Sequence, residues 1–230
     1  MRDYYQSQLD AINKNLIDMS LLLENAIENS ILCLKNPDAK LIEASSQIEL
    51  DINRMERGLE DLCLNVILHQ QPVAGDFHMV SAALKMITDM ERIGDIANDI
   101  ALLSAMIKES RSSRILSDII KMGKITVEML KKGIDAYINR NVQIALEACC
   151  EDDSVDGMFN RVKESLVNMI KEEDKGAEEA PDLLMIAKYF ERLGDHLVNV
   201  AEWVVYAFTG TRKGQLDTIS DIDEAIGGIQ

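Results

Sequence analysis

The sequence predicts an all-α protein built as two tandem, pseudo-symmetric three-helix bundles with six long helices. Apolar residues recur at helical spacing along most of the 230 residues. Only 3 Pro and 12 Gly interrupt this pattern, and aromatic residues make up only 4%, which argues against a β-sandwich core. A five-residue motif also occurs twice, 100 residues apart, as an internal duplication would produce.

The first repeat is predicted to contain helices over residues 4–34, 38–69 and 76–109. The first helix has an apolar face with the spacing of a buried stripe, formed by Leu9, Leu16, Met19, Leu23, Ile27 and Ile31. It should end at Asn36-Pro37, because the residue before a proline disfavours the helical conformation. The next loop is expected at Gln71-Pro72-Val73-Ala74-Gly75, a cluster of turn-forming residues.

The second repeat is predicted to contain helices over residues 114–138, 141–173 and 182–209, with a loop at 175–181. The polar stretch 109–113, with sequence Glu-Ser-Arg-Ser-Ser, divides the two repeats. We therefore expect a first repeat over 1–110, a second over 111–210, and a flexible C-terminal tail over 211–230.

The chain is acidic, with a formal net charge of −16. Such a chain should repel nucleic acid and anionic membrane surfaces, and should suit metal cations or a basic patch on a protein partner. A simple solvated acidic surface is the alternative. The N-terminus lacks the apolar core of a signal peptide, and no apolar stretch approaches the ~20 residues of a membrane span. With four cysteines and no C-x-x-C pair, we expect a cytoplasmic protein without direct membrane insertion.

The duplicated motif reads E-R-I-G-D at Glu91–Asp95 and E-R-L-G-D at Glu191–Asp195, an offset of 191 − 91 = 100. A weaker match aligns Asn36–Asn53 with Asn139–Asp156, at an offset of 103. The difference of three residues fits a change in one loop length. Chance similarity between two amphipathic helices does not readily explain two matches in the same order.

The motif acids are predicted to form lines of oxygen ligands on the outer surface. Residues four apart share a helix face, so Glu91, Asp95 and Asp99 form one line opposite the packed side. Second lines on the preceding helices could face the same sites if those helices are antiparallel. Carboxylate and amide oxygens without thiolate or imidazole suit Mg²⁺, Mn²⁺ or iron. The candidate metal ligands are Glu49, Asn53, Glu91, Asp95, Asp99, Asp152, Asp156, Glu191, Asp195 and Asn199.

Gly94 and Gly194 lie inside predicted helices, where glycine costs about 1 kcal/mol relative to alanine. We therefore expect another helix to approach closely at both positions. Arg92 and Arg192 are expected either to pair with nearby acids or to hold a partner. His196 is interpreted as an interface or surface residue, with a peripheral ligand role as the alternative.

No P-loop, G-x-G-x-x-G, G-x-S-x-G or Cys/His nucleophile arrangement is present in the sequence, so no catalytic residues are assigned and a non-enzyme is expected. Two alternatives stay open. One is a metal-dependent hydrolase that uses the acidic clusters as a Lewis-acid site, and the other is a metal-buffering helical protein.

The paired E-R-(I/L)-G-D segments, with the acidic pairs Glu49/Asn53 and Asp152/Asp156 upstream, resemble the PhoU family over roughly residues 3–210. The resemblance implies two three-helix bundles whose acidic lines bind multinuclear metal clusters of iron or zinc, with magnesium or manganese also possible. It implies a negative regulator of phosphate uptake and phosphate-starvation signalling. The implied partners are the ATPase subunit of a phosphate ABC transporter and a sensor histidine kinase, and the implied assembly is a homodimer.

This sequence departs from the PhoU family pattern at three positions in or near the acidic lines. Asn53 stands where an acid is common, Ile96 replaces a frequent histidine, and Asp99 stands where asparagine is usual. The two sites are therefore expected to differ in affinity or in metal.

Overall fold

A computed structural model describes residues 2–73, 75–108, 113–172 and 176–211, and this part of the chain is helical with no strand. Three long helices form the first repeat: α1 (Arg2–Lys35), α2 (Ala39–Gln70) and α3 (Gly75–Leu103). The second repeat contains α4 (Arg114–Asn139), α5 (Val142–Cys150), α6 (Asp152–Lys171) and α7 (Ala180–Thr209). Two short 3₁₀ turns, η1 (Ser104–Met106) and η3 (Ala177–Glu179), follow α3 and precede α7.

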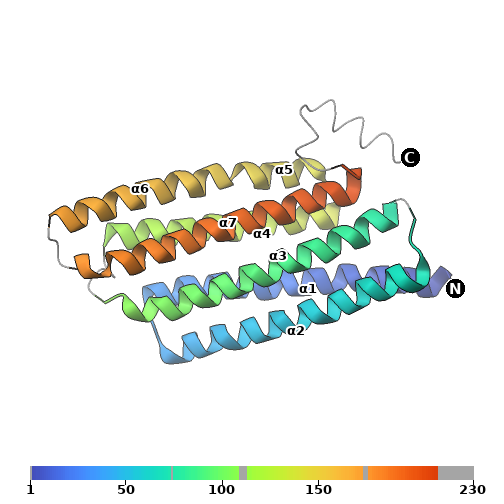
Figure 1. The fold of residues 1–230 in the computed structure, drawn as a ribbon, viewed down its shortest axis with the longest axis horizontal. Helices are drawn as coiled ribbons and strands as arrows, with labels where there is room; N and C mark the ends of the chain where they lie inside the picture. Colours follow the sequence, from blue (N-terminus) through green and yellow to red (C-terminus); the bar gives the residue numbers. More distant parts are fainter. Residues whose placement is uncertain (1, 74, 109–112, 173–175, 212–230) are drawn as a thin grey trace.

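The helices are arranged as two bundles that lie side by side (Figure 1). Helices α1, α2 and α3 pack on one another, and so do α4, α7 and the α5–α6 pair. The most extensive contact in the molecule joins α3 to α7, and α1 also packs on α4. The predicted fold class, two pseudo-symmetric bundles built from a duplicated sequence, is confirmed.

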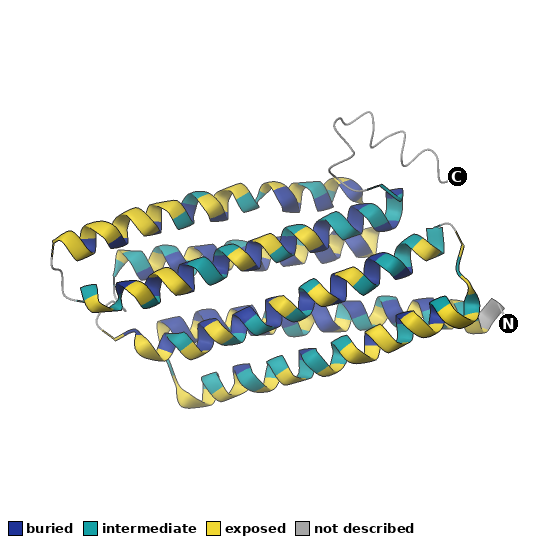
Figure 2. Ribbon diagram, viewed as in Figure 1, coloured by how far each residue is buried: buried dark blue, intermediate teal, exposed yellow. Residues whose placement is uncertain are grey.

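The buried residues form a core that continues through both repeats (Figure 2). All six residues predicted on the inner face of the first helix are at most 6% exposed. The apolar stripe of α7 is also buried, at Leu193, Leu197, Val200 and Val204. Periodicity was sufficient to identify these faces because each long helix buries one continuous stripe.

The helix ends follow the capping residues in the sequence. Asp38 caps α2 by accepting a hydrogen bond from the Lys40 amide at 3.0 Å, and Ser113 caps α4 by accepting one from the Leu116 amide at 3.1 Å. At the far end of α7, Gly210 takes a left-handed conformation with φ 71°, which glycine adopts without steric cost.

Two of the predicted boundaries are wrong. The helix predicted over 141–173 is divided at Glu151, where the Glu151 amide bonds to the Ala148 carbonyl and the Ser154 amide bonds to the Glu151 carbonyl. These three-residue steps replace the four-residue steps of an α-helix and tighten the chain locally. The helix predicted to reach residue 109 ends at Leu103, because the same tightening occurs where the Ile107 amide bonds to the Ser104 carbonyl.

Some of the expected features fall outside the described residues. The boundary expected at 110/111 lies there, as does most of the expected tail over 211–230. Within the part of the chain that the structure describes, no helix combines the length and the apolar character that a membrane crossing requires.

Candidate functional site

The first acidic surface lies where α2 faces α3, and consists of Glu49, Asn53, Glu56, Glu91 and Asp95. The Asn53 side-chain amide donates a hydrogen bond to Glu49 Oε1 at 2.6 Å. The charge of Glu49 helps raise the pKa of Asp95, and the charges of Glu56 and Glu49 help raise that of Glu91. The two helices therefore bring their acids together, as the spacing of the sequence predicted.

The acids of this surface are less exposed than the prediction of outward-pointing side chains implied. The side chains of Glu91 and Asp95 are only 24% and 35% exposed. Burial is the largest cause of the raised pKa of both carboxyls. Arg92 opposes this effect, with Nε 3.5 Å from Glu91 and Nη1 3.6 Å from Asp95. One of the two uses anticipated for Arg92, pairing with nearby acids, is therefore confirmed.

The second acidic surface lies where α6 faces α7, and consists of Asp152, Asp153, Asp156, Glu191 and Asp195. Burial and the charges of the other four members together raise the pKa of Asp152 to about 6, with burial the largest cause. Glu191, whose side chain is 15% exposed, forms an ion pair with Lys188. The pseudo-symmetry thus places a second group of acids at the equivalent place in the other bundle.

The close helix approach predicted at both motif glycines is confirmed. A Cβ on Gly94 would lie 2.9 Å from Ile52 Cδ1, closer than real Cβ contacts come. A Cβ on Gly194 would overlap with the Oδ1 atom of Asp152 and lie 3.7 Å from Val155. The glycines therefore allow α2 to pack closely on α3 and α6 to pack closely on α7. This packing holds the acids of α2 and α6 close to the duplicated motif.

Asp99 and Asn199 lie at the contact between α3 and α7. Asn199 Nδ2 donates to Asp89 Oδ1 at 3.1 Å, while Asp99 is hydrogen-bonded to the hydroxyl of Tyr189. Asp89 and Tyr189 are 100 residues apart, as are Asp99 and Asn199. The two contacts are therefore equivalent under the duplication, with donor and acceptor exchanged.

Asp89 is a residue that sequence reasoning missed. Asp89 Oδ1 also lies 2.8 Å from Nδ1 of His196. The side chain of Asp89 is only 17% exposed and that of His196 only 20%. His196 is thus an interface residue, as predicted. The signal that could have identified Asp89 is its place opposite His196 and Asn199 once α3 and α7 are laid antiparallel.

The carboxylate and amide oxygens of both surfaces are ligands that hard cations prefer, but they do not converge on one point. Two buried oxygens, Asn53 Oδ1 on the first surface and Asp152 Oδ1 on the second, have no hydrogen-bond partner. Within the described ranges, no three His, Cys, Asp or Glu side chains are already arranged to hold a metal ion. A cation would therefore require side-chain rotation, and would satisfy oxygens that the protein leaves unpaired.

The fold and these two surfaces define a class of duplicated three-helix-bundle proteins with a partly buried acidic surface in each half. The PhoU domain profile matches residues 16–103 and 119–204. The chain belongs to the PhoU family. A "Phosphate-specific transport system accessory protein PhoU homolog" of Clostridium acetobutylicum is 31% identical over 210 residues, covering 91% of this chain and 96% of the relative. The "Phosphate-specific transport system accessory protein PhoU" of Escherichia coli K12 is 25% identical, covering 90% and 86%.

Solved structures agree with this assignment. The crystal structure of PhoU from Pseudomonas aeruginosa superposes with a TM-score of 0.84 at 26% identity, covering 90% of this chain and all of that one. A phosphate transport system regulatory protein PhoU from Streptococcus pneumoniae superposes with a TM-score of 0.83, covering 90% of this chain and 98% of the other. At 21% identity, this second match supports the shared fold.

Proposed function

We propose that this protein is a regulator of phosphate transport that lowers phosphate uptake and phosphate-starvation signalling. The observation that carries the proposal is the match to curated PhoU proteins over nearly their whole length, with both repeats included. These relatives are named as accessory proteins of the phosphate-specific transport system. The same names favour a regulator over an enzyme.

In this proposal, the protein is a cytoplasmic adaptor between the ATPase subunit of a phosphate ABC transporter and a sensor histidine kinase, and works as a homodimer. The acidic composition suits such a role, because a partner with a basic patch would meet complementary charge on the surfaces of α2–α3 and α6–α7. Electrostatic complementarity of this kind mainly sets the rate and specificity of association, which suits a regulator that must exchange partners.

We also propose that the two acidic surfaces bind cations. Glu49, Asn53, Glu91 and Asp95 would hold one group of ions, and Asp152, Asp156, Glu191 and Asp195 the other. Asp99 and Asn199 are the weaker candidates, because each already bonds across the α3–α7 contact. Bound cations would neutralise carboxylates that repel one another, and would fix how much negative charge a partner meets.

The direct test measures phosphate uptake and a phosphate-starvation reporter in cells that lack the gene. Loss of the protein should leave both high when phosphate is plentiful, and expression of the wild-type chain should restore repression. A pull-down against the transporter ATPase and the kinase should recover both partners. Normal repression in the deletion strain would contradict the regulatory role, whatever the metal content.

A variant with Glu91→Gln, Asp95→Asn, Glu191→Gln and Asp195→Asn separates the metal proposal from the partner proposal. Metal content is measured on the purified variant beside the pull-down. Loss of metal with partners retained would mean that the acidic surfaces serve the ions alone. Unchanged metal content in a folded variant would contradict the assignment of these ligands.

A further inference from the structure

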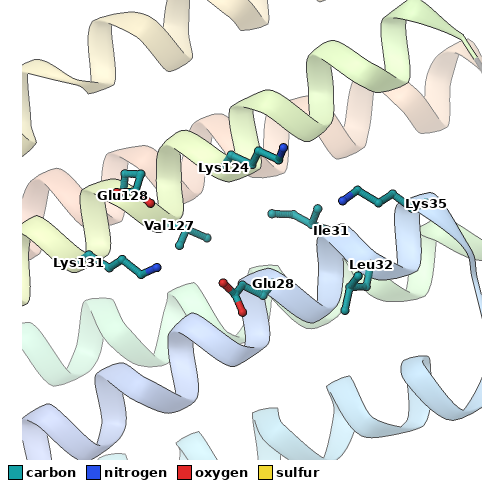
Figure 3. Close-up of a pocket in the computed structure, with 8 residues that line it drawn as sticks. All are labelled: Glu28, Ile31, Leu32, Lys35, Lys124, Val127, Glu128 and Lys131. Atoms are coloured by element: carbon teal, nitrogen blue, oxygen red, sulfur yellow. The ribbon is translucent and has the colours of Figure 1, made fainter.

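A pocket of about 510 Å³ lies between α1 and α4, on helices that make up neither acidic surface. Its floor is apolar, from Ile31 and Val127, and the partly exposed Leu32 stands at its side. Charged side chains surround this floor (Figure 3). They are Glu28 and Lys35 of α1, and Lys124, Glu128 and Lys131 of α4.

The charges divide the pocket into two ends. At one end Lys131 is already neutralised, because its Nζ lies 2.9 Å from Glu24, and the Glu28 carboxylate points toward it as well (Figure 3). At the other end Lys35 and Lys124 point toward one another (Figure 3). Among the described residues, neither lysine forms an ion pair with an acid. The two ammonium groups repel each other at this separation. A ligand that carries a negative group next to an apolar group would therefore bind favourably at this end of the pocket.

The sequence beyond α7 has this chemistry. Within residues 216–226, apolar side chains recur every three to four positions at Leu216, Ile219, Ile222 and Ile226. The same segment carries four acids and no Lys or Arg, giving a charge of −4, with the acids at Asp217, Asp221, Asp223 and Glu224. In a chain with a net charge of −16, a cationic end over an apolar floor is a local exception that such a segment would complement.

The geometry allows the segment to reach the pocket. The rings of Phe208 and Tyr137 are 5.9 Å apart, so α7 and α4 end together, and the left-handed conformation of Gly210 ends α7 there. Tyr137 and Lys124 are 13 positions apart on α4, about 20 Å at 1.5 Å per residue. Asp221 is ten positions beyond Thr211, so an extended chain between them can span about 33 Å, which exceeds the distance back to Lys124.

From this we propose that residues 216–226 dock on the α1–α4 pocket of their own chain, with the acids at 221–224 between Lys35 and Lys124 and the apolar side chains on the pocket floor. Docking would cover exposed Leu32 and relieve the repulsion of the two lysines. The inference concerns a face that the proposed metal sites and their partners do not use.

A zero-length carbodiimide cross-link between lysine and carboxylate tests the proposal on the full chain. An equal mixture of ¹⁴N- and ¹⁵N-labelled protein is cross-linked, digested and analysed by mass spectrometry. The expected product joins Lys35 or Lys124 to Asp221, Asp223 or Glu224 of the same isotope. Cross-links of these lysines to residues outside 216–226 alone would overturn the proposal. Links of which about half join different isotopes, as random pairing of two copies in an equal mixture gives, would also overturn it, and would identify a second copy as the occupant.

A variant that keeps every reacting group tests whether the apolar floor contributes. Ile219→Ser with Ile222→Ser should lower the yield of these cross-links at least fivefold, while a matched control, Thr218→Ala with Ser220→Ala, should keep the wild-type yield. Unchanged helicity and an unchanged melting temperature would show that each variant remains folded. An unchanged yield in the isoleucine variant would mean that charge alone brings the groups together, and would overturn docking on the pocket.

Discussion

Oδ1 of Asp152 occupies the space that a side chain on Gly194 would need, so the first turn of α6 lies directly on the motif of α7. In the other bundle the equivalent space above Gly94 is filled by Ile52. The duplication aligns Val155 with Ile52, and valine is one methylene smaller than isoleucine. The Asp152 carboxylate fills the space near Gly194 that corresponds to the space filled by Ile52 near Gly94. The two surfaces therefore differ in how deeply an acid is inserted.

The first prediction concerns the pH dependence that Asp152 contributes. Its pKa is raised from 3.8 to about 6, so the folded state binds this proton more tightly than the unfolded chain does. The stabilisation is present in acid and is lost as pH rises through about 6. Asp152→Asn should therefore stabilise the protein at pH 7.5 by about 1 kcal/mol, after a discount for solvent screening, and should have little effect at pH 4.

Urea unfolding at both pH values, in a metal-free buffer, measures this difference. Asp153→Asn is the matched control, because it removes an exposed acid from the next position. An equal gain from both substitutions would mean that the net charge of the surface, and not the burial of Asp152, controls its stability.

A second prediction compares two glycines of α4. A Cβ on Gly123 would lie 2.7 Å from Phe190 Cε1 and 2.9 Å from Ile31, whereas nothing lies within 4 Å of one on Gly133. Gly123→Ala should destabilise the protein by about 1–3 kcal/mol, because fully buried Phe190 has little room to move. Gly133→Ala should stabilise it by up to about 1 kcal/mol through helix propensity. Thermal melting of both variants decides the matter, and changes of the same sign would refute the packing argument.

A third prediction concerns cations. If the acidic surfaces bind Mn²⁺, a concentration of 100 times the dissociation constant should stabilise the protein by about 2.7 kcal/mol per independent site. The variant with Glu91→Gln, Asp95→Asn, Glu191→Gln and Asp195→Asn should lose this response. Differential scanning fluorimetry with and without Mn²⁺ provides the measurement.

The control for this experiment removes the same number of acids from exposed positions outside both surfaces: Asp10→Asn, Asp18→Asn, Glu43→Gln and Glu164→Gln. This control should keep the Mn²⁺ response. A response that falls equally in both variants would show that Mn²⁺ acts by general screening of an acidic protein.

A fourth prediction concerns the polar contacts that Asp89 of α3 makes with His196 and Asn199 of α7. Asp89→Ala removes the acceptor of both His196 and Asn199, and should cost about 1–2 kcal/mol, because the carboxylate is mostly covered and its bonds are charge-assisted when His196 is protonated. A double-mutant cycle with Asn199→Ala measures the coupling. A coupling energy indistinguishable from zero would place the exposed Asn199 outside the interface energetically.

Much of the fold could be predicted because long helices repeat one apolar stripe, as the buried series from Leu9 to Ile31 does. The close approach at Gly94 and Gly194 was predictable, since a costly glycine needs a reason. The residue that packs against each glycine was not predictable. Whether it is an apolar residue such as Ile52 or an acid such as Asp152 depends on the rotation of the neighbouring helix about its axis. The break at Glu151 depends on local hydrogen bonds that no periodicity records.

The candidate site was predicted at the level of faces and not of contacts. Glu49, Glu91 and Asp95 meet as spacing on antiparallel helices implied. Asn199 shares the line of Glu191 and Asp195 in sequence, but its amide reaches across to Asp89, because the contact between the repeats competes for the same helix. A helical wheel gives the direction of a side chain, and cannot give the distance to an element from the other half of the chain.

The α3–α7 contact and the continuous core have a calorimetric consequence. Phe190 of the second repeat and Ile31 of the first meet at Gly123, so neither repeat closes its interior alone. We expect the chain to melt in one transition whose van't Hoff enthalpy equals the calorimetric enthalpy, as for a single cooperative unit. Each repeat expressed as a separate polypeptide should then behave as a molten globule, and mixing the two should restore sharp melting by fragment complementation.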